Sequence, residues 1–105
     1  MINATAQNGW TALIWAADTG LTTTAEKLIQ AKANVNHADN YNGWTALHWA
    51  ACYGHAAVAD LLLKANANPT AVTDYGDTTA QLAEQRSHTE LAQRLRQAAA
   101  SAAEK

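Results

Sequence analysis

The segment Asn8-Gly9-Trp10-Thr11-Ala12-Leu13-Ile14-Trp15-Ala16-Ala17 recurs 34 residues later as Asn42-Gly43-Trp44-Thr45-Ala46-Leu47-His48-Trp49-Ala50-Ala51. A weaker third copy begins 33 residues after Gly43, with Gly76-Asp77-Thr78-Thr79-Ala80-Gln81-Leu82-Ala83. The first two copies share further residues at the same shift: Gly20 and Gly54, Leu28 and Leu62, Asn34 and Asn68. A constant period of this length is typical of stacked repeats, each of which is one small supersecondary unit.

The composition of the 105 residues favours helices and a single domain. Apolar residues make up 49% of the chain, but 26 residues are Ala, so few large side chains remain to build a core. The chain has one Pro and no Phe, whereas β-sandwiches and barrels need β-branched and aromatic residues on their strands. Closely packed helices are the natural use of so much Ala.

The same composition excludes several kinds of partner. No apolar run approaches the roughly 20 residues of a membrane span, and no charged leader precedes an apolar stretch, so we expect no membrane partner. A net charge of −2 argues against nucleic acid, which usually demands a basic domain. The single cysteine, Cys52, excludes an intrachain disulfide and favours a reducing intracellular compartment, the cytoplasm.

Each copy is predicted to form two helices. A threonine precedes every first Ala/Leu-rich segment, where its hydroxyl can accept a free N–H of the first turn: Thr11, Thr45 and Thr78. The expected helices are residues 11–18, 23–30, 45–52, 55–63, 78–85 and 88–98. Their inward faces should be buried, at Leu13, Leu28, Leu47, Val58, Leu62, Leu82, Leu91, Leu95, Ala16, Ala17, Ala50, Ala51 and Ala83.

Local signals mark where the helices begin and end. Capping boxes are indicated at Thr23–Glu26, Thr78–Gln81 and Ser87–Glu90. Asn66 follows the second helix of copy two at a position where we expect left-handed backbone. Lys32 stands at that position in copy one, which should cost about 1 kcal/mol relative to Gly.

The pattern resembles the ankyrin repeat over about residues 2–97. The resemblance is carried by Asp39, by Gly43-Trp44-Thr45-Ala46-Leu47-His48-Trp49-Ala50-Ala51-Cys52-Tyr53-Gly54-His55, by Val58 and Leu61-Leu62-Leu63, and by the turn Ala33-Asn34-Val35-Asn36. It implies an all-α solenoid of stacked helix–turn–helix units, with β-hairpin-like loops projecting at right angles from one edge. The family's Thr-Pro-Leu-His is Thr-Ala-Leu-Ile, Thr-Ala-Leu-His and Thr-Thr-Ala-Gln here, and Asn42 lengthens one hairpin by a residue.

We expect one array over residues 1–105, with repeats at about 5–38 and 39–72, a capping repeat at about 73–98 and a tail or fraying helix end after it. Copy three is polar where a further repeat would dock, as a terminal repeat requires: Gln81, Glu84, Gln85, Glu90, Gln93, Arg94 and Gln97. The N-terminal copy lacks such a cap. Its apolar residues, Ile14, Leu21, Ile29 and the Met1–Ile2 segment, are therefore expected to lie uncovered.

Candidate chemistry is sparse. His48, Cys52 and His55 have the residue types and near spacing of a soft-metal site, but the resemblance assigns both histidines a structural role, bonding to neighbouring turns. Asp39 and Asp74 are read as turn residues whose carboxylates cap backbone N–H groups. The glycines are isolated, so no phosphate loop is indicated. We expect no catalytic residues, no cofactor and no metal.

The aromatic residues are more informative. Trp15 and Trp49 lie within first helices and are expected to pack between repeats. The other aromatics fall on hairpins or at helix ends, which the resemblance assigns to the partner-binding surface, and Tyr and Trp are favoured as interface anchors. The expected partner-binding residues are Trp10, Asp18, Thr19, Asn40, Tyr41, Trp44, Cys52, Tyr53, Asp74, Tyr75, Asp77, Gln85 and Arg86.

Two functional hypotheses follow. In the first, the chain is a non-catalytic interaction module that binds another protein through the hairpin tips and the concave helix face. In the second, it is a fragment or engineered scaffold that self-associates through its uncapped N-terminal repeat and has no other partner. The sedimentation behaviour of the purified chain separates the two.

Overall fold

The chain folds into six helices arranged as three pairs, in a computed structural model that describes residue 5 and residues 11–40 and 42–103. The helices are α1 (Ala12–Thr19), α2 (Thr22–Gln30), α3 (Ala46–Cys52), α4 (Ala56–Lys64), α5 (Thr79–Gln85) and α6 (Thr89–Ala103). The described ranges contain no strand, only an isolated antiparallel bridge between Val72 and Thr78. The all-α prediction is confirmed, and the predicted helix boundaries agree within one residue except at the end of α6.

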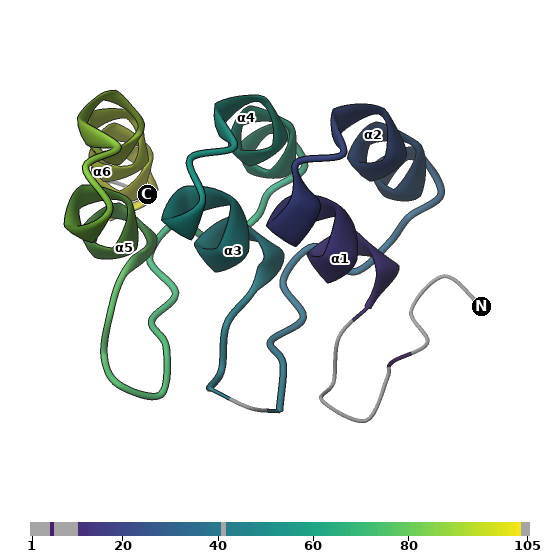
Figure 1. Ribbon diagram of the computed structural model, residues 1–105, viewed down its shortest axis with the longest axis horizontal. Helices are drawn as coiled ribbons and strands as arrows, with labels where there is room; N and C mark the ends of the chain where they lie inside the picture. Colours follow the sequence, from purple (N-terminus) through teal and green to yellow (C-terminus); the bar gives the residue numbers. More distant parts are fainter. Residues whose placement is uncertain (1–4, 6–10, 41, 104–105) are drawn as a thin grey trace.

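The pairs stack side by side into two layers (Figure 1). Helices α1, α3 and α5 form one row, and α2, α4 and α6 form the other. The loops that lead into α3 and α5 extend as hairpins from the first row, away from the second. The side chains on the first row and on these hairpins therefore share one side of the molecule.

Threonine hydroxyls start the helices of the first row. Thr11 Oγ1 accepts a hydrogen bond from Ile14 N at 3.3 Å, and Thr78 forms a full capping box with Gln81. These bonds satisfy N–H groups that a helix N-terminus leaves without an internal partner. The boxes predicted at Thr23–Glu26 and Ser87–Glu90 are wrong. Helix α2 begins one residue before Thr23 with no side-chain cap, and Ser87 belongs to the preceding turn.

The turns inside the pairs depend on a contact between repeats. Gly20 has φ 73°, and a Cβ placed there would lie 2.7 Å from the His55 ring of the next unit. Gly54 has φ 72°, and a Cβ placed there would lie 2.6 Å from the His88 ring of the following unit. The third equivalent is Ser87, also left-handed at φ 67°. Glycine is thus required where the ring of the next unit packs against the turn, as at Gly20 and Gly54.

The core runs the length of the stack between the two rows. Every residue predicted to be buried is buried except Leu28, which is only partly covered. Leu62, its counterpart in copy two, is fully buried because α4 lies between α2 and α6. Helix α2 packs on α1 and on α4, at the outer end of the described stack. A single flanking unit explains the partial exposure of Leu28.

The prediction that Ile14 lies on an uncovered face is wrong, because Ile14 is fully buried. Its counterpart His48 reaches forward to Ala71 in the following hairpin. By repeat equivalence, Ile14 faces the hairpin that follows α1 rather than the N-terminal end. Leu21, by contrast, is 52% exposed, as expected for that end, and Ile29 is partly buried. Met1–Ile2 lies outside the described residues.

The C-terminal unit carries the expected polar outer surface, since all seven polar residues predicted there are exposed. Helix α6 continues to Ala103, so residues 99–103 extend the helix instead of forming a tail. Arg94 pairs with Asp60 of α4 at 2.9 Å, and Arg96 pairs with Glu84 of α5. These exposed ion pairs contribute little to stability, typically below about 1 kcal/mol each.

Lys32 has φ 70°, so its backbone lies in the left-handed region that favours glycine. We expect Lys32→Gly to raise the free energy of unfolding by about 1 kcal/mol, because it removes that steric cost. Lys27→Gly, inside α2, is the matched control and should lower stability by a similar amount. Urea denaturation of both variants measures the difference. A loss of stability in Lys32→Gly would contradict the left-handed assignment.

Candidate functional site

His48 uses both of its ring nitrogens inside the fold. Nδ1 accepts a hydrogen bond from Thr45 N at 3.0 Å, completing the capping box of α3. Nε2 lies 3.1 Å from the carbonyl oxygen of Ala71 and donates to it. The ring is therefore neutral, with its proton on Nε2, and it ties the start of α3 to the next hairpin. Burial lowers the pKa of His48, and this outweighs its backbone hydrogen bonds and the nearby carboxylates.

The remaining members of the possible metal set are also engaged or enclosed. His55 Nε2 bonds the carbonyl oxygen of Asp18 at 3.1 Å, which links α4 to α1. Cys52 is only 4% exposed, and burial raises the pKa of its thiol. Within the part of the chain that the structure describes, no three His, Cys, Asp or Glu side chains group as metal ligands. His48 and His55 have the structural role that the resemblance implies.

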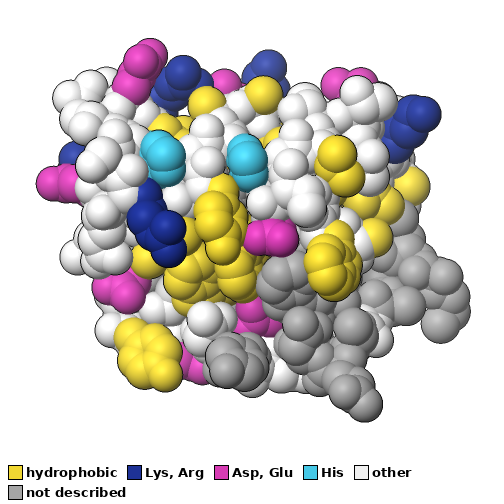
Figure 2. Space-filling view, viewed as in Figure 1, with side chains coloured by type: hydrophobic (Ala, Val, Ile, Leu, Met, Phe, Trp, Pro, Cys, Tyr) yellow, Lys and Arg dark blue, Asp and Glu magenta, His cyan; other side chains and the backbone are white. Residues whose placement is uncertain are grey.

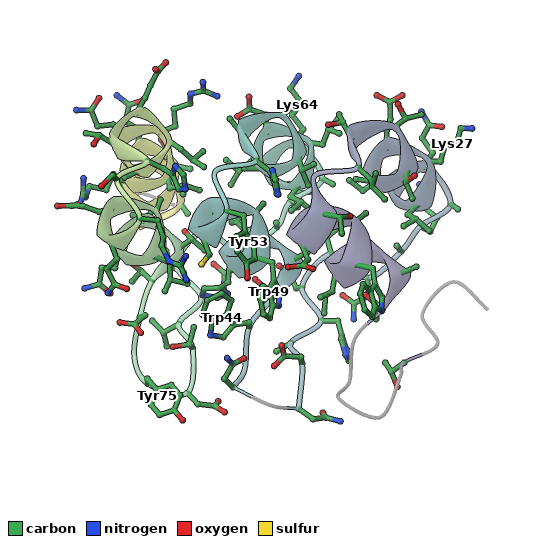
Figure 3. The ribbon with its side chains drawn as sticks, in the orientation of Figure 1. Lys27, Trp44, Trp49, Tyr53, Lys64 and Tyr75 are labelled. Carbon is green, nitrogen blue, oxygen red and sulfur yellow. The ribbon has the colours of Figure 1, made fainter. Side chains whose placement is uncertain are left out.

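Three aromatic side chains form a row of ring contacts from the preceding hairpin to the end of α3, here called the aromatic stripe: Trp44, Trp49 and Tyr53 (Figure 3). The Trp44 and Trp49 ring centroids are 4.5 Å apart, and Trp49 and Tyr53 stack at 6.0 Å with an interplanar angle of 15°. The guanidinium of Arg86 lies over the Tyr53 ring, 5.9 Å from its centroid. The stripe rises from the hairpin toward the C-terminal end of α3.

The hairpin before α3 holds Trp44 at the lower end of the stripe. Asp39 is buried, and its Oδ1 accepts hydrogen bonds from Asn42 N at 3.0 Å and from Trp44 N at 3.3 Å. In the amide orientation that satisfies its neighbours, the Asn42 side chain donates to Asp39 and accepts from Trp44 Nε1 at 3.1 Å. The Asn42 carbonyl also accepts from Asp74 N at 2.9 Å. The extra residue of this hairpin thus fixes Trp44 and joins two hairpins.

The hairpin before α5 presents polar and aromatic groups outward. Thr73 is buried, and its Oγ1 accepts from Tyr75 N and Asp77 N at 3.2 Å each. The capping role predicted for Asp74 therefore belongs to Thr73, and the Asp74 side chain is exposed. Tyr75 stands at the tip and is 81% exposed (Figure 3). Its exposure leaves a large apolar ring available for contact.

Most of the predicted partner-binding residues lie on the first-row and hairpin side of the molecule. Tyr53 is 43% exposed, and the other exposed or half-buried members are Asp18, Thr19, Asn40, Trp44, Asp74, Tyr75, Asp77, Gln85 and Arg86. Cys52 is the exception, because it is enclosed beneath this surface and cannot contact a partner. Trp10 and Tyr41 lie outside the described residues.

The tryptophans of the first helices depart from the prediction that they simply pack between repeats. Trp49 packs against the core but also forms the middle of the aromatic stripe. Its spacing of four residues from Tyr53 places both on one face of a helix, a signal available in the sequence. Trp15 is 52% exposed on α1, so packing does not cover it.

Comparison with known proteins supports the repeat assignment. The family model described as ankyrin repeats (3 copies) matches residues 1–73. No curated protein matches the chain. No helix in the described ranges is long and apolar enough to cross a membrane.

The neutral state of His48 makes stability depend on pH. Because the pKa of His48 is lowered in the folded chain, the unfolded chain binds a proton more readily once the pH falls below about 6.5. The stabilising contribution of neutral His48 to the free energy of unfolding is therefore fully present above that pH and is lost progressively below it. We expect His48→Gln to make the free energy of unfolding less dependent on pH between pH 5 and pH 7.5, measured by urea denaturation across that range.

Glutamine is the appropriate replacement because Gln81 already fills this role in copy three. Its side-chain oxygen accepts from Thr78 N at 2.8 Å, as His48 Nδ1 does from Thr45. The capping bond is thus kept, while the titrating ring and its bond to Ala71 are removed. An unchanged pH profile in His48→Gln would contradict the assignment.

Proposed function

We propose, from the premise that this chain belongs to the ankyrin-repeat family, that it is a non-catalytic module that binds another protein through its hairpins and first-row helices. Ankyrin repeats are generally protein–protein interaction modules and generally carry no catalytic activity. The partner-binding surface is the side that carries the aromatic stripe, Tyr75 and the polar residues around them. This is the side that the family resemblance describes as concave.

The observation that carries the proposal is the aromatic stripe. Its three rings follow one another along α3, and Tyr53 and Tyr75 expose much of their surface. Partly exposed Trp and Tyr rings on a rigid frame are what interface anchors require, because they bury a large area at a small cost in side-chain entropy. The Trp44 end of the stripe is fixed by the Asn42 hairpin, and the Arg86 guanidinium lies over the ring at the Tyr53 end.

The fate of the reactive groups supports binding rather than catalysis. His48 is committed to two hydrogen bonds within the fold, and Cys52 is buried with a raised pKa. A cysteine nucleophile would instead need a lowered pKa and access to substrate. The exposed side chains of this surface are aromatic rings, carboxylates, amides and one guanidinium, which are ordinary interface groups.

Affinity capture tests this function. The intact chain is compared with the Trp44→Ala, Tyr53→Ala double variant, and captured proteins are quantified by mass spectrometry. We expect at least one protein to be retained by the intact chain and to bind the variant roughly ten-fold less, the scale of losing one anchoring residue. Circular dichroism verifies that the variant keeps its helices.

The matched control changes the opposite side of the molecule. Lys27 and Lys64 lie on the second row, at the edge away from the hairpins (Figure 3). The Lys27→Ala, Lys64→Ala variant should capture the same protein as the intact chain. Equal loss in both double variants would show that the stripe is not the binding surface.

Self-association is a second candidate, favoured by the exposed apolar side chains at the α1/α2 end. Trp15 and Leu21 are each 52% exposed, and Leu28 and Ile29 are only partly buried. The opposite end of the stack is polar, so head-to-tail stacking of copies is disfavoured. A symmetric dimer would bring two α1/α2 ends together.

Sedimentation velocity distinguishes this candidate. A dimer at micromolar concentration that dissociates in the Leu21→Gln variant would support it, since that change makes the exposed end polar. Tyr75→Ala is the control, because Tyr75 lies on a hairpin tip remote from α2. A monomer in every sample contradicts self-association and leaves the interaction module as the only function of the two.

A further inference from the structure

The charged side chains are divided unequally between the two sides of the array. Among the described residues, the first-row helices and hairpins carry one cation, Arg86, and five carboxylates: Asp18, Asp39, Asp74, Asp77 and Glu84. The second-row helices and the turn after α2 carry three carboxylates and five cations. The hairpin side thus has a net charge of −4 and the second-row side +2. The small net charge of the chain conceals this separation.

Asp18 and Asp74 lie near the two ends of the aromatic stripe, whereas Glu84 is paired with Arg96 and Asp39 is buried. Asp18 and Arg86 both act electrostatically on Cys52, so they approach α3 from its two sides. In Figure 2 an acidic and a basic side chain flank the hydrophobic patch at the centre of this face. Asp74 is at the lower end, where its Oδ1 would be 2.5 Å from a Cβ on Gly43, the residue before Trp44. An incoming group meets aromatic rings inside a negative field.

Arg86 indicates how the stripe accommodates a cation. Its guanidinium already lies over the Tyr53 ring, held by the attraction between a positive charge and the electron-rich face of the ring. Arg86 is exposed and lies at the end of α5, and among the described residues no carboxylate forms an ion pair with it. A second cation can therefore replace it by the same interaction.

We propose that the aromatic stripe binds a basic segment of the partner protein, with a Lys or Arg side chain stacked on Tyr53 in place of Arg86 and further cations attracted by Asp18 and Asp74. This inference rests on the proposed function and names the chemistry of the partner. Electrostatic complementarity of this kind accelerates encounter and selects among partners. Nucleic acids and acidic segments are disfavoured, because their negative charges face the same carboxylates.

Selection from a random short-peptide library tests the chemistry directly. The library is panned against the intact immobilised chain, and bound peptides are eluted and sequenced. We expect the enriched peptides to carry a net positive charge and at least one Arg or Lys beside an apolar residue. Replacing the Arg and Lys of an enriched peptide by Gln should weaken its binding at least about ten-fold, and added salt should weaken the original peptide.

Two variants that remove the same charge test the place of the cation. Arg86→Gln removes the group that competes for Tyr53, and Lys64→Gln removes a positive charge from the second row. We expect Arg86→Gln to bind the enriched peptide roughly two- to five-fold more tightly, the range of one exposed cation–π contact, and Lys64→Gln to bind it as the intact chain does. An equal gain in both variants would overturn stacking on Tyr53.

The outcomes separate this inference from the proposed function. Tyr53→Ala, which changes an exposed ring and leaves the core intact, should abolish the binding of enriched peptides. Enrichment of neutral or acidic peptides whose binding still requires Tyr53 would overturn the inference that the partner segment is basic. It would leave the proposed interaction function unchanged. Peptides that bind Tyr53→Ala and the intact chain equally would overturn both. Failure to enrich any peptide overturns the basic-segment inference.

Discussion

The stack depends on how closely its helices approach, and alanine sets that distance. Ala17, Ala50, Ala51 and Ala83 have no measurable exposure, because they lie where the first-row helices meet their neighbours. Interiors packed this closely leave little room for larger side chains, which would force backbone shifts. Once the spacing is fixed, His48 and His55 reach carbonyl oxygens in adjacent elements and hold the units in register. The hairpins and the aromatic stripe inherit their positions from that register.

The fold could be predicted from the sequence because the same local signals recur in each repeat. Threonine before an Ala/Leu segment has one structural meaning in all three copies, and the hydrogen bonds of Thr11, Thr45 and Thr78 agree with it. The capping boxes at Thr23 and Ser87 misled because a box motif is also satisfied by chance inside a helix or a turn. At Ser87 the repeat itself was the better guide, since its equivalents are Gly20 and Gly54.

The surface was less accessible because exposure depends on which neighbour a side chain meets. Ile14 and Cys52 are both buried, although the next residue in the sequence, Trp15 or Tyr53, is exposed. Repeat equivalence places Ile14 correctly only once the direction of His48 is known. The stripe required knowledge that Trp44, at the end of a hairpin, turns onto Trp49 of the helix. The Asn42 side-chain amide holds Trp44 in this position. From the sequence, Asn42 is recognised only as an insertion that lengthens the hairpin.

The ring-on-turn contact between units gives the stack a direction, much as the two ends of a polymer differ. His55 and His88 each lie against the glycine turn of the unit before them, and a Cβ at that turn would force the ring to shift. Ser87 stands at the equivalent left-handed position and carries a Cβ where Gly20 and Gly54 have none. Lengthening this array by design would therefore begin with the removal of one hydroxymethyl group at residue 87, before any new helix is added.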